Sequence, residues 1–121
     1  MPTTEKEART AAERKIDSQL LYEIYRKRGE AAAKYVPSGP TGVRIDAHGR
    51  ALVDIRGPVT PALTTLVTQL GGSVVSTAPR YQSIIARVPL LKIERIARRG
   101  EVRAISPAAE ADIRRGPRPS E

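Results

Sequence analysis

The chain has 121 residues, which suffice for one small domain with short appendages. It contains no cysteine, and this excludes disulfide bonds and thiolate metal sites. The 21 basic residues outnumber the 13 acidic ones and give a net charge of +8. This excess fits an acidic partner, such as nucleic acid or an acidic protein face. It equally fits a well-solvated surface, so both interpretations stay open.

No apolar stretch has the pattern of a secretory signal or of a membrane-spanning helix. We therefore expect no membrane association, and a cytoplasmic protein as the sequence stands. If the sequence is part of a longer precursor, a secreted or periplasmic location is expected instead.

Residues 1–35 predict an amphipathic helix. The segment Thr4-Glu5-Lys6-Glu7 has the pattern of a capping box, and Gly29 is a weak point at which the helix bends or ends. A narrow apolar stripe at helical spacing is formed by Ile16, Leu20, Leu21 and Ile24. Such a stripe packs on the rest of the domain, binds a partner or self-associates, and the sequence leaves these three possibilities open.

Residues 36–50 connect this helix to the core. The stretch from Val36 to Gly42 is rich in Pro and Gly, which predicts a linker or an ordered loop. Apolar and charged residues alternate from Val43 to Asp46, and Ala47-His48-Gly49 has the composition of a turn. We expect a hairpin, which either adds an edge strand to a sheet or makes the first core strand a long bent ribbon.

Residues 51–107 predict the order strand, helix, strand, strand, helix, strand. The expected strands are 51–56, 73–78, 81–88 and 101–105. Thr60 and Pro61 fit the N-cap and first residue of the first helix, and Gly71-Gly72 fits its left-handed end. The apolar stripe of this helix consists of Leu63, Leu66, Val67 and Leu70.

The second helix is expected to begin at Pro89 and to end at Gly100. Its inward side chains are Leu90, Ile93, Ile96 and Ala97. In the strand before it, Ile84, Ala86 and Val88 share one face, while Ile85 and Arg87 share the other. Pro107 stops the last strand, and residues 108–121 predict a flexible C-terminal tail.

This order of elements predicts an α+β fold of the ferredoxin-like βαββαβ type. Right-handed crossovers place both helices on one face of a four-stranded antiparallel sheet, with the strand order 4-1-3-2. The other face of the sheet is left open. An N-terminal helix precedes this unit. The fold alone does not define a function.

The residue types needed for catalysis are scarce. The single histidine, His48, lies in a predicted turn, where a solvated side chain is expected rather than a catalytic base. Asp46 and Asp54 have arginines as neighbours, which predicts surface ion pairs. No glycine-rich phosphate loop and no metal-ligand spacing is present. We therefore expect a protein that is not an enzyme and that uses no metal and no cofactor.

Nucleic-acid binding is a further alternative, because ferredoxin-like sheets often bind RNA. Such sheets stack bases on aromatic side chains of the third strand. The expected third strand has none beyond Tyr81 at its start. We do not expect sequence-specific RNA binding. Weak electrostatic binding of phosphates stays open.

Three segments of the core carry a resemblance to a known family. They are 66–76, where a helix ends and a strand begins, 86–91, where a strand meets its helix, and 96–107. Together they resemble the propeptide, or inhibitor I9, domain of subtilisin-like serine peptidases, over about half of the chain. The segment 15–21 also resembles the one that precedes this domain in some large bacterial subtilases.

The resemblance implies a mechanism without catalysis. In that family the open sheet face packs on two surface helices of the peptidase, and the segment after the last strand lies like a substrate in the active-site cleft. The domain assists folding of the peptidase and inhibits it. The open face would include Leu52, Asp54, Arg56, Ile85, Arg87, Arg103 and Ile105. The cleft segment would consist of Ser106, Pro107, Ala108, Ala109, Glu110, Ala111 and Asp112.

The sequence also permits an adaptor that binds another protein through its N-terminal helix. The contact residues would then be Ile16, Leu20, Leu21 and Ile24. Neither hypothesis identifies the partner or the oligomeric state.

Overall fold

The structure is a computed structural model that describes residues 10–29 and 43–108. The expectations for the capping box at 4–7, the loop 36–42 and the tail from 109 onward lie outside the described residues. The sheet contains β1 (Arg50–Arg56), β2 (Ser73–Ala78), β3 (Ser83–Pro89) and β4 (Ala104–Pro107). Their order is β2-β3-β1-β4, and all neighbours are antiparallel. The predicted α+β class is confirmed, and the order is compatible with a ferredoxin-like arrangement.

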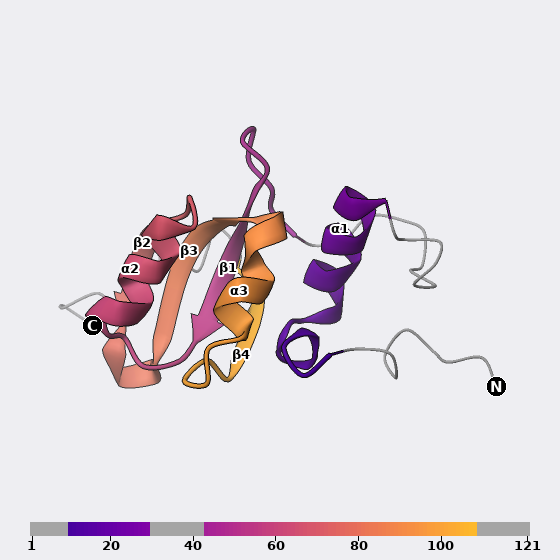
Figure 1. Cartoon of the computed structure of the whole chain (residues 1–121). Coiled ribbons are helices and arrows are strands. Elements are labelled where there is room, and N and C mark those ends of the chain that lie inside the picture. Colours follow the sequence, from indigo (N-terminus) through magenta and orange to yellow (C-terminus); the bar gives the residue numbers. More distant parts are fainter. Residues whose placement is uncertain (1–9, 30–42, 109–121) are drawn as a thin grey trace.

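Helices α2 (Pro61–Gln69) and α3 (Ile93–Ala97) lie across the same face of the sheet (Figure 1). Buried side chains from both helices join one core with the inward residues of the strands. These residues are Leu63, Val67, Ile93, Ile96, Ala97, Ala51, Val53, Ile55, Ile84, Ala86, Val88 and Ile105. The opposite face of the sheet carries no helix of the described residues.

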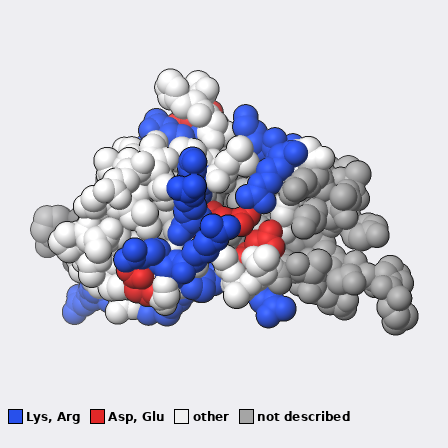
Figure 2. Space-filling model, viewed as in Figure 1, with Lys and Arg blue, Asp and Glu red and all other residues white. Residues whose placement is uncertain are grey.

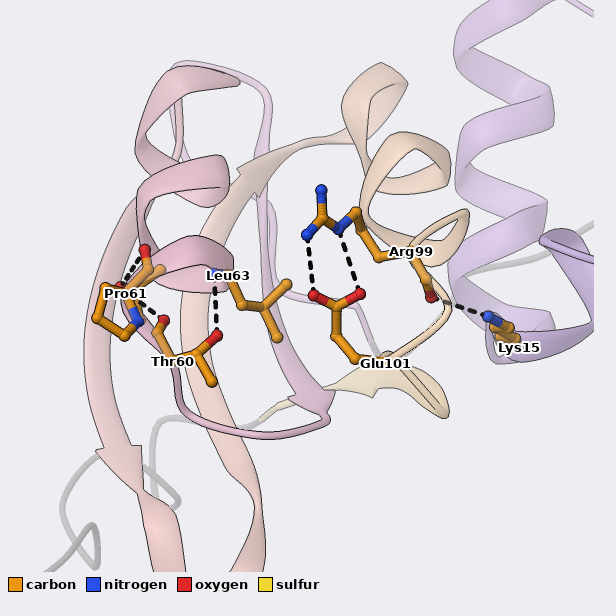
Figure 3. A network of polar contacts seen from close by, with 7 residues as sticks. Lys15, Thr60, Pro61, Leu63, Arg99 and Glu101 are labelled. Carbon is orange, nitrogen blue, oxygen red and sulfur yellow. Dashed lines mark hydrogen bonds and ion pairs between the residues drawn. The ribbon is translucent and has the colours of Figure 1, made fainter.

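The predicted start of α2 is confirmed. The Oγ1 of Thr60 accepts a hydrogen bond from the N–H of Leu63 at 3.2 Å, and Pro61 is the first helical residue (Figure 3). The hydroxyl satisfies an N–H group that has no partner inside the helix, and the missing N–H of proline costs nothing at this position.

The end of α2 is a Schellman motif, also as predicted. Gly71 has a φ of +90°, and its N–H donates to the carbonyl of Thr68 at 3.0 Å. The N–H of Gly72 donates to the carbonyl of Val67 at 2.9 Å. These two bonds satisfy carbonyls at the end of the helix and turn the chain directly into β2.

Two strands begin later than predicted. A 3-10 helix, η2 (Pro79–Tyr81), and a left-handed Gln82 with φ +50° delay β3 to Ser83. The N–H of Val102 donates to the carbonyl of Arg99 at 3.1 Å, so the chain is still in a turn there and β4 begins only at Ala104. Pro107 is the last residue of β4 rather than a residue beyond it.

The second predicted helix is also shorter than expected. Pro89 belongs to β3, and a 3-10 helix, η3 (Leu90–Lys92), separates it from α3. The four side chains predicted to point inward, namely Leu90, Ile93, Ile96 and Ala97, are all buried. The periodicity therefore identified the buried face correctly but not the helix type at its start.

The prediction of a single N-terminal helix is wrong for the described residues. A 3-10 helix, η1 (Glu13–Lys15), is followed by an extended Ile16 and then by α1 (Ser18–Arg28). The Oδ1 of Asp17 accepts from the N–H of Gln19 at 2.8 Å and caps α1. Gly29, with φ +75°, ends α1 at the position that the sequence marked as weak.

A capping box precedes η1. The N–H of Thr10 donates to Oε1 of Glu13 at 2.8 Å, and the N–H of Glu13 donates to Oγ1 of Thr10 at 3.2 Å. The other carboxylate oxygen of Glu13 accepts from the hydroxyl of Tyr25 in α1 at 3.1 Å. The buried Glu13 thereby ties η1 to α1.

The N-terminal segment lies along the outer edge of β4. Ile16 forms a parallel bridge with Ile105, and the N–H of Asp17 donates to the carbonyl of Ile105 at 2.8 Å. The nearby Nζ of Lys15 donates to the carbonyl of Arg99 at 3.1 Å (Figure 3). These contacts hold the segment against β4 and the turn that precedes it.

The apolar stripe of the N-terminal segment is part of the same core. Its members Ile16, Leu20, Leu21 and Ile24 are all buried in the cluster that contains the inward residues of the sheet. Of the three possibilities left open by the sequence, packing on the domain is the one that the structure shows. The core covers these four side chains, so binding a partner through them would require α1 to leave the domain.

Candidate protein-binding face

The face of the sheet opposite the helices is the candidate site. Along β1 the side chains of Leu52, Asp54 and Arg56 alternate with the buried core residues of the helix side. In the register of β1 with β3, Leu52 lies opposite Arg87 and Asp54 lies opposite Ile85. Opposite residues of an antiparallel pair share a face, so these five residues lie together on the open face, as predicted.

The polar centre of the open face is built around Asp54. Its Oδ1 accepts from the hydroxyl of Ser83 at 2.6 Å, and its Oδ2 lies 2.9 Å from Nη2 of Arg56. The Asp54 side chain is 15% exposed, whereas that of Arg56 is 46% exposed. The negative charge of Asp54 is therefore balanced by Arg56, and its side chain is held in place by Ser83. Arg56 is the more exposed group of the pair and the one that a partner can contact. The predicted ion pairing of Asp54 with an arginine is confirmed.

The apolar centre of the open face is a small second cluster. It contains Leu52, Ile85 and Ala108, against which Val75 packs. Leu52 is 2% exposed and Ile85 is 7% exposed. A partner on this face therefore meets mainly the polar side chains around the cluster.

The first residues of the predicted cleft segment belong to the sheet. Ser106 lies opposite Asp54, and Pro107 lies opposite Val53. The N–H of Ala108 donates to the carbonyl of Leu52 at 3.0 Å, so pairing with β1 extends one residue beyond β4. The remaining predicted members, Ala109, Glu110, Ala111 and Asp112, lie outside the described residues.

Two residues are not where the sequence placed them. Ile105 lies opposite Ile55 and is buried on the helix side, so its assignment to the open face is wrong. The error follows from the late start and register of β4. Arg103 precedes β4, where its N–H donates to the carbonyl of Arg56 at 2.8 Å and its Nη1 bonds to Oε1 of Gln82. It therefore lies at the end of the sheet, next to Arg56 and Gln82.

Sequence reasoning missed Ser83 and the bulge in β2. Ser83 is opposite Arg56, and the alternation of β3 would have identified it once the strand start was known. The register of β2 with β3 shifts between Val74 and Ser76, which releases Val75 to the open face. No sequence signal marks that bulge.

The helix side of the molecule carries many basic side chains. Figure 2 shows Lys and Arg gathered over this side, around a few acidic groups. Glu94 of α3 is buried, and its Oε1 lies 2.7 Å from Nη2 of Arg28 while its Oε2 lies 3.8 Å from Nη2 of Arg98. The contact between Glu94 and Arg28 is an ion pair whose alignment is not that of a hydrogen bond. Glu94 thereby connects α3 to α1.

The predicted hairpin before β1 is confirmed. The N–H of Asp46 donates to the carbonyl of Arg50, and the N–H of Leu52 to that of Arg44, both at 2.9 Å. The carboxylate of Asp46 accepts from the N–H groups of Arg50 and His48 and from Nε of Arg50. These bonds, above all the one from the Arg50 backbone, lower the pKa of Asp46 below its usual 3.8. His48 itself is exposed.

The described residues contain no group of three or more His, Cys, Asp or Glu side chains that would hold a metal ion. None of their helices has the length and apolar character needed to cross a bilayer. Comparisons with family models, with curated proteins and with solved structures find no match to this chain.

Proposed function

We propose that this chain is a non-catalytic protein-binding domain that engages and inhibits a subtilisin-like serine peptidase. In this proposal, the open face of the sheet docks on the surface of the peptidase. The segment that follows β4 enters the active-site cleft, where main-chain hydrogen bonds give affinity and side-chain pockets give selectivity.

One observation carries the proposal. The helices of the described residues cover one face of the sheet, and Ala108, the last described residue, pairs with Leu52 and packs on the other face. A partner that binds this face therefore meets the start of the segment proposed for its cleft. The resemblance to inhibitor I9 domains in segments 66–76, 86–91 and 96–107 gives the class of partner.

The burial of Leu52 and Ile85 limits how the face binds. Arg56 is the open-face residue with a charged and substantially exposed side chain in a defined position. We assign it the main contact with the peptidase surface. An acidic group on the peptidase would compete with Asp54 for this guanidinium, and such contacts affect both association rate and affinity.

The test is inhibition of a purified subtilisin-like peptidase, assayed with a chromogenic peptide substrate. We expect the full chain to inhibit, and Arg56→Gln to weaken inhibition by about tenfold, the size of a hydrogen-bonded interfacial charge. Arg95→Gln is the matched control, because Arg95 is an exposed arginine on α3, on the helix side. Equal inhibition by both variants would exclude the open face as the docking surface.

A truncation tests the cleft segment separately. A chain that ends at Ala108 keeps the strand pairing with Leu52 and the second apolar cluster. We expect it to remain folded and to lose inhibition. A chain that ends at Ser106 also removes buried Ala108 and is expected to lose stability, which would confuse the result. Full inhibition by the chain that ends at Ala108 would contradict the proposed role of the segment.

The surface proposed for the adaptor hypothesis is buried in the core. Its contact residues Ile16, Leu20, Leu21 and Ile24 lie in the core, so binding through them would require α1 to leave the domain. No observation on the described residues favours that step.

A further inference from the structure

We propose that the outer edge of β2 binds an extended, acidic segment of a partner protein by strand addition. This surface is distinct from the open face, and the inference does not depend on the peptidase proposal. It follows from a difference in backbone pairing between the two edges of the sheet.

The edge formed by β4 and the first half of β1 is closed. Ile16 and Asp17 pair with Ile105 on the outside of β4. The hairpin residues Arg44 and Asp46 pair with the part of β1 that β4 does not reach. Within the described residues, an incoming strand would therefore have to displace these pairings along this side of the sheet.

The edge formed by β2 is unpaired in the part of the chain that the structure describes and has little protection against an added strand. β2 is the terminal strand of the sheet, and within the described residues nothing pairs with its outer side. Natural edge strands are usually protected by charged side chains, prolines or a covering element. The segment from Gly71 to Ala78 contains neither a charge nor a proline, and three of its residues, Val74, Val75 and Thr77, are β-branched and typical of strands. Its one protective feature is the bulge at Val75.

The bulge restricts where a strand can add. It interrupts the ladder between Val74 and Ser76, so the regular stretch runs from Ser76 to Ala78. This stretch leads to Arg80 and Tyr81, both of which are exposed. Tyr81 is 67% exposed, and Arg80 is in no ion pair among the described residues. A strand that pairs with Ser76–Ala78 therefore ends beside an aromatic ring and an available guanidinium.

Charge selects the occupant. A second copy of this chain would bring a further net charge of +8 to the edge, and its own β2 offers no acid to Arg80. An acidic extended segment instead gains main-chain hydrogen bonds along β2 and an ion pair with Arg80. The observations thus favour a foreign acidic strand over self-association.

The test uses a capped synthetic peptide in which valine and threonine alternate with glutamate, titrated into the full chain labelled with nitrogen-15. We expect the amide signals of residues 73–81 to shift, and the outward-pointing N–H groups of β2 to exchange at least roughly tenfold more slowly. A peptide with lysine in place of glutamate is the matched control.

The Arg80→Gln variant should bind the glutamate peptide about two- to fivefold more weakly, the size of an exposed ion pair. The Arg95→Gln variant should bind it unchanged.

Two proline variants test the main-chain pairing. Successive residues of a strand direct their N–H groups to opposite edges, so only one of Ser76→Pro and Thr77→Pro removes an outward-pointing donor. That variant is expected to keep the unfolding midpoint closer to wild type and to abolish peptide binding. Binding retained by both variants, or peptide-induced shifts confined to other parts of the sheet, would overturn the proposal. So would a dimer, detected by sedimentation, that protects the β2 amides without peptide.

Discussion

At the scale of single residues, Gly72 occupies a position where the fold leaves no room for a side chain. A Cβ atom at this position would lie 2.6 Å from the carbonyl oxygen of Arg87 and 2.9 Å from that of Val67. Both atoms belong to the backbone, so neither can move aside easily. The glycine therefore allows the end of α2 to approach β3 closely.

We predict that Gly72→Ala lowers the free energy of unfolding by about 1–3 kcal/mol or more, the usual cost of overpacking. Gly100→Ala is the control, since a Cβ there meets no heavy atom within 4 Å and its φ is not positive. That variant should be neutral or slightly more stable. Urea unfolding of the two variants measures the difference. Equal stability would mean that the backbone at Gly72 relaxes at no cost.

A second prediction concerns pH and the hairpin residue Asp46. Hydrogen bonds lower its pKa in the folded state below the usual 3.8, and the Arg99 side chain likewise lowers the pKa of Glu101 below 4.5. A lowered folded-state pKa means that the ionised group favours the fold. This contribution is complete above the usual pKa and is lost as the pH falls through the folded-state value.

Thermal unfolding of wild type and of Asp46→Asn, compared from neutral to strongly acidic pH, measures this contribution. We expect the wild type to be the more stable at neutral pH and the difference to narrow below pH 3.8. Glu101→Gln should show the same narrowing below pH 4.5. A difference that does not depend on pH would assign the role of Asp46 to geometry alone.

At the scale of elements, the placement of α1 has the largest consequence. Its buried side chains are Leu20, Leu21, Ile24 and Tyr25, and they share the core with the sheet. The helix also contacts η3 and β4, and Glu94 and Arg28 link it to α3. A helix of 11 residues is marginal alone, so this packing provides its stability.

We predict that Leu21→Ala destabilises the whole protein by about 2–5 kcal/mol, the range for a large-to-small change in a core. Gln19→Ala, on the exposed side of α1, should change stability by less than about 0.5 kcal/mol. Urea unfolding monitored on sheet amides distinguishes the outcomes. If Leu21→Ala loosens α1 and leaves the sheet unaffected, α1 is an independent appendage.

The elements also show what a sequence predicts and what it does not. Caps and alternation are local signals, and they correctly identified α2 with Thr60 and Gly71, the two faces of β3, and most of the open face. The predicted N-terminal helix is interrupted at Ile16, because this residue is extended by its bridge to Ile105, a partner that no local pattern reveals. Ile105 was placed on the wrong face because the turn bond from Val102 to Arg99 shifts the start of β4.

At the scale of the whole molecule, a single core predicts a single folding transition. The cluster on the helix side includes residues from α1, α2, α3, β1, β3 and β4, and the partly buried Val74 of β2 packs against it. Small domains with one core usually unfold in one step. We therefore predict that the amides of Leu21 in α1 and Ile84 in β3 exchange through openings of the same free energy. Much faster exchange at Leu21, followed by hydrogen exchange and NMR, would show that α1 opens separately.

The bridge between Ile16 and Ile105 also has a consequence for synthesis. The two residues are 89 positions apart in the sequence. At typical translation rates the ribosome makes Ile105 roughly 4 to 18 seconds after Ile16. During most of that interval α1 exists without η3 and β4, the elements that it contacts in the finished fold, so its apolar stripe is not yet covered. The nascent chain therefore exposes an apolar segment to which chaperones can bind. This segment becomes buried once η3 and β4 have been made and α1 packs on them.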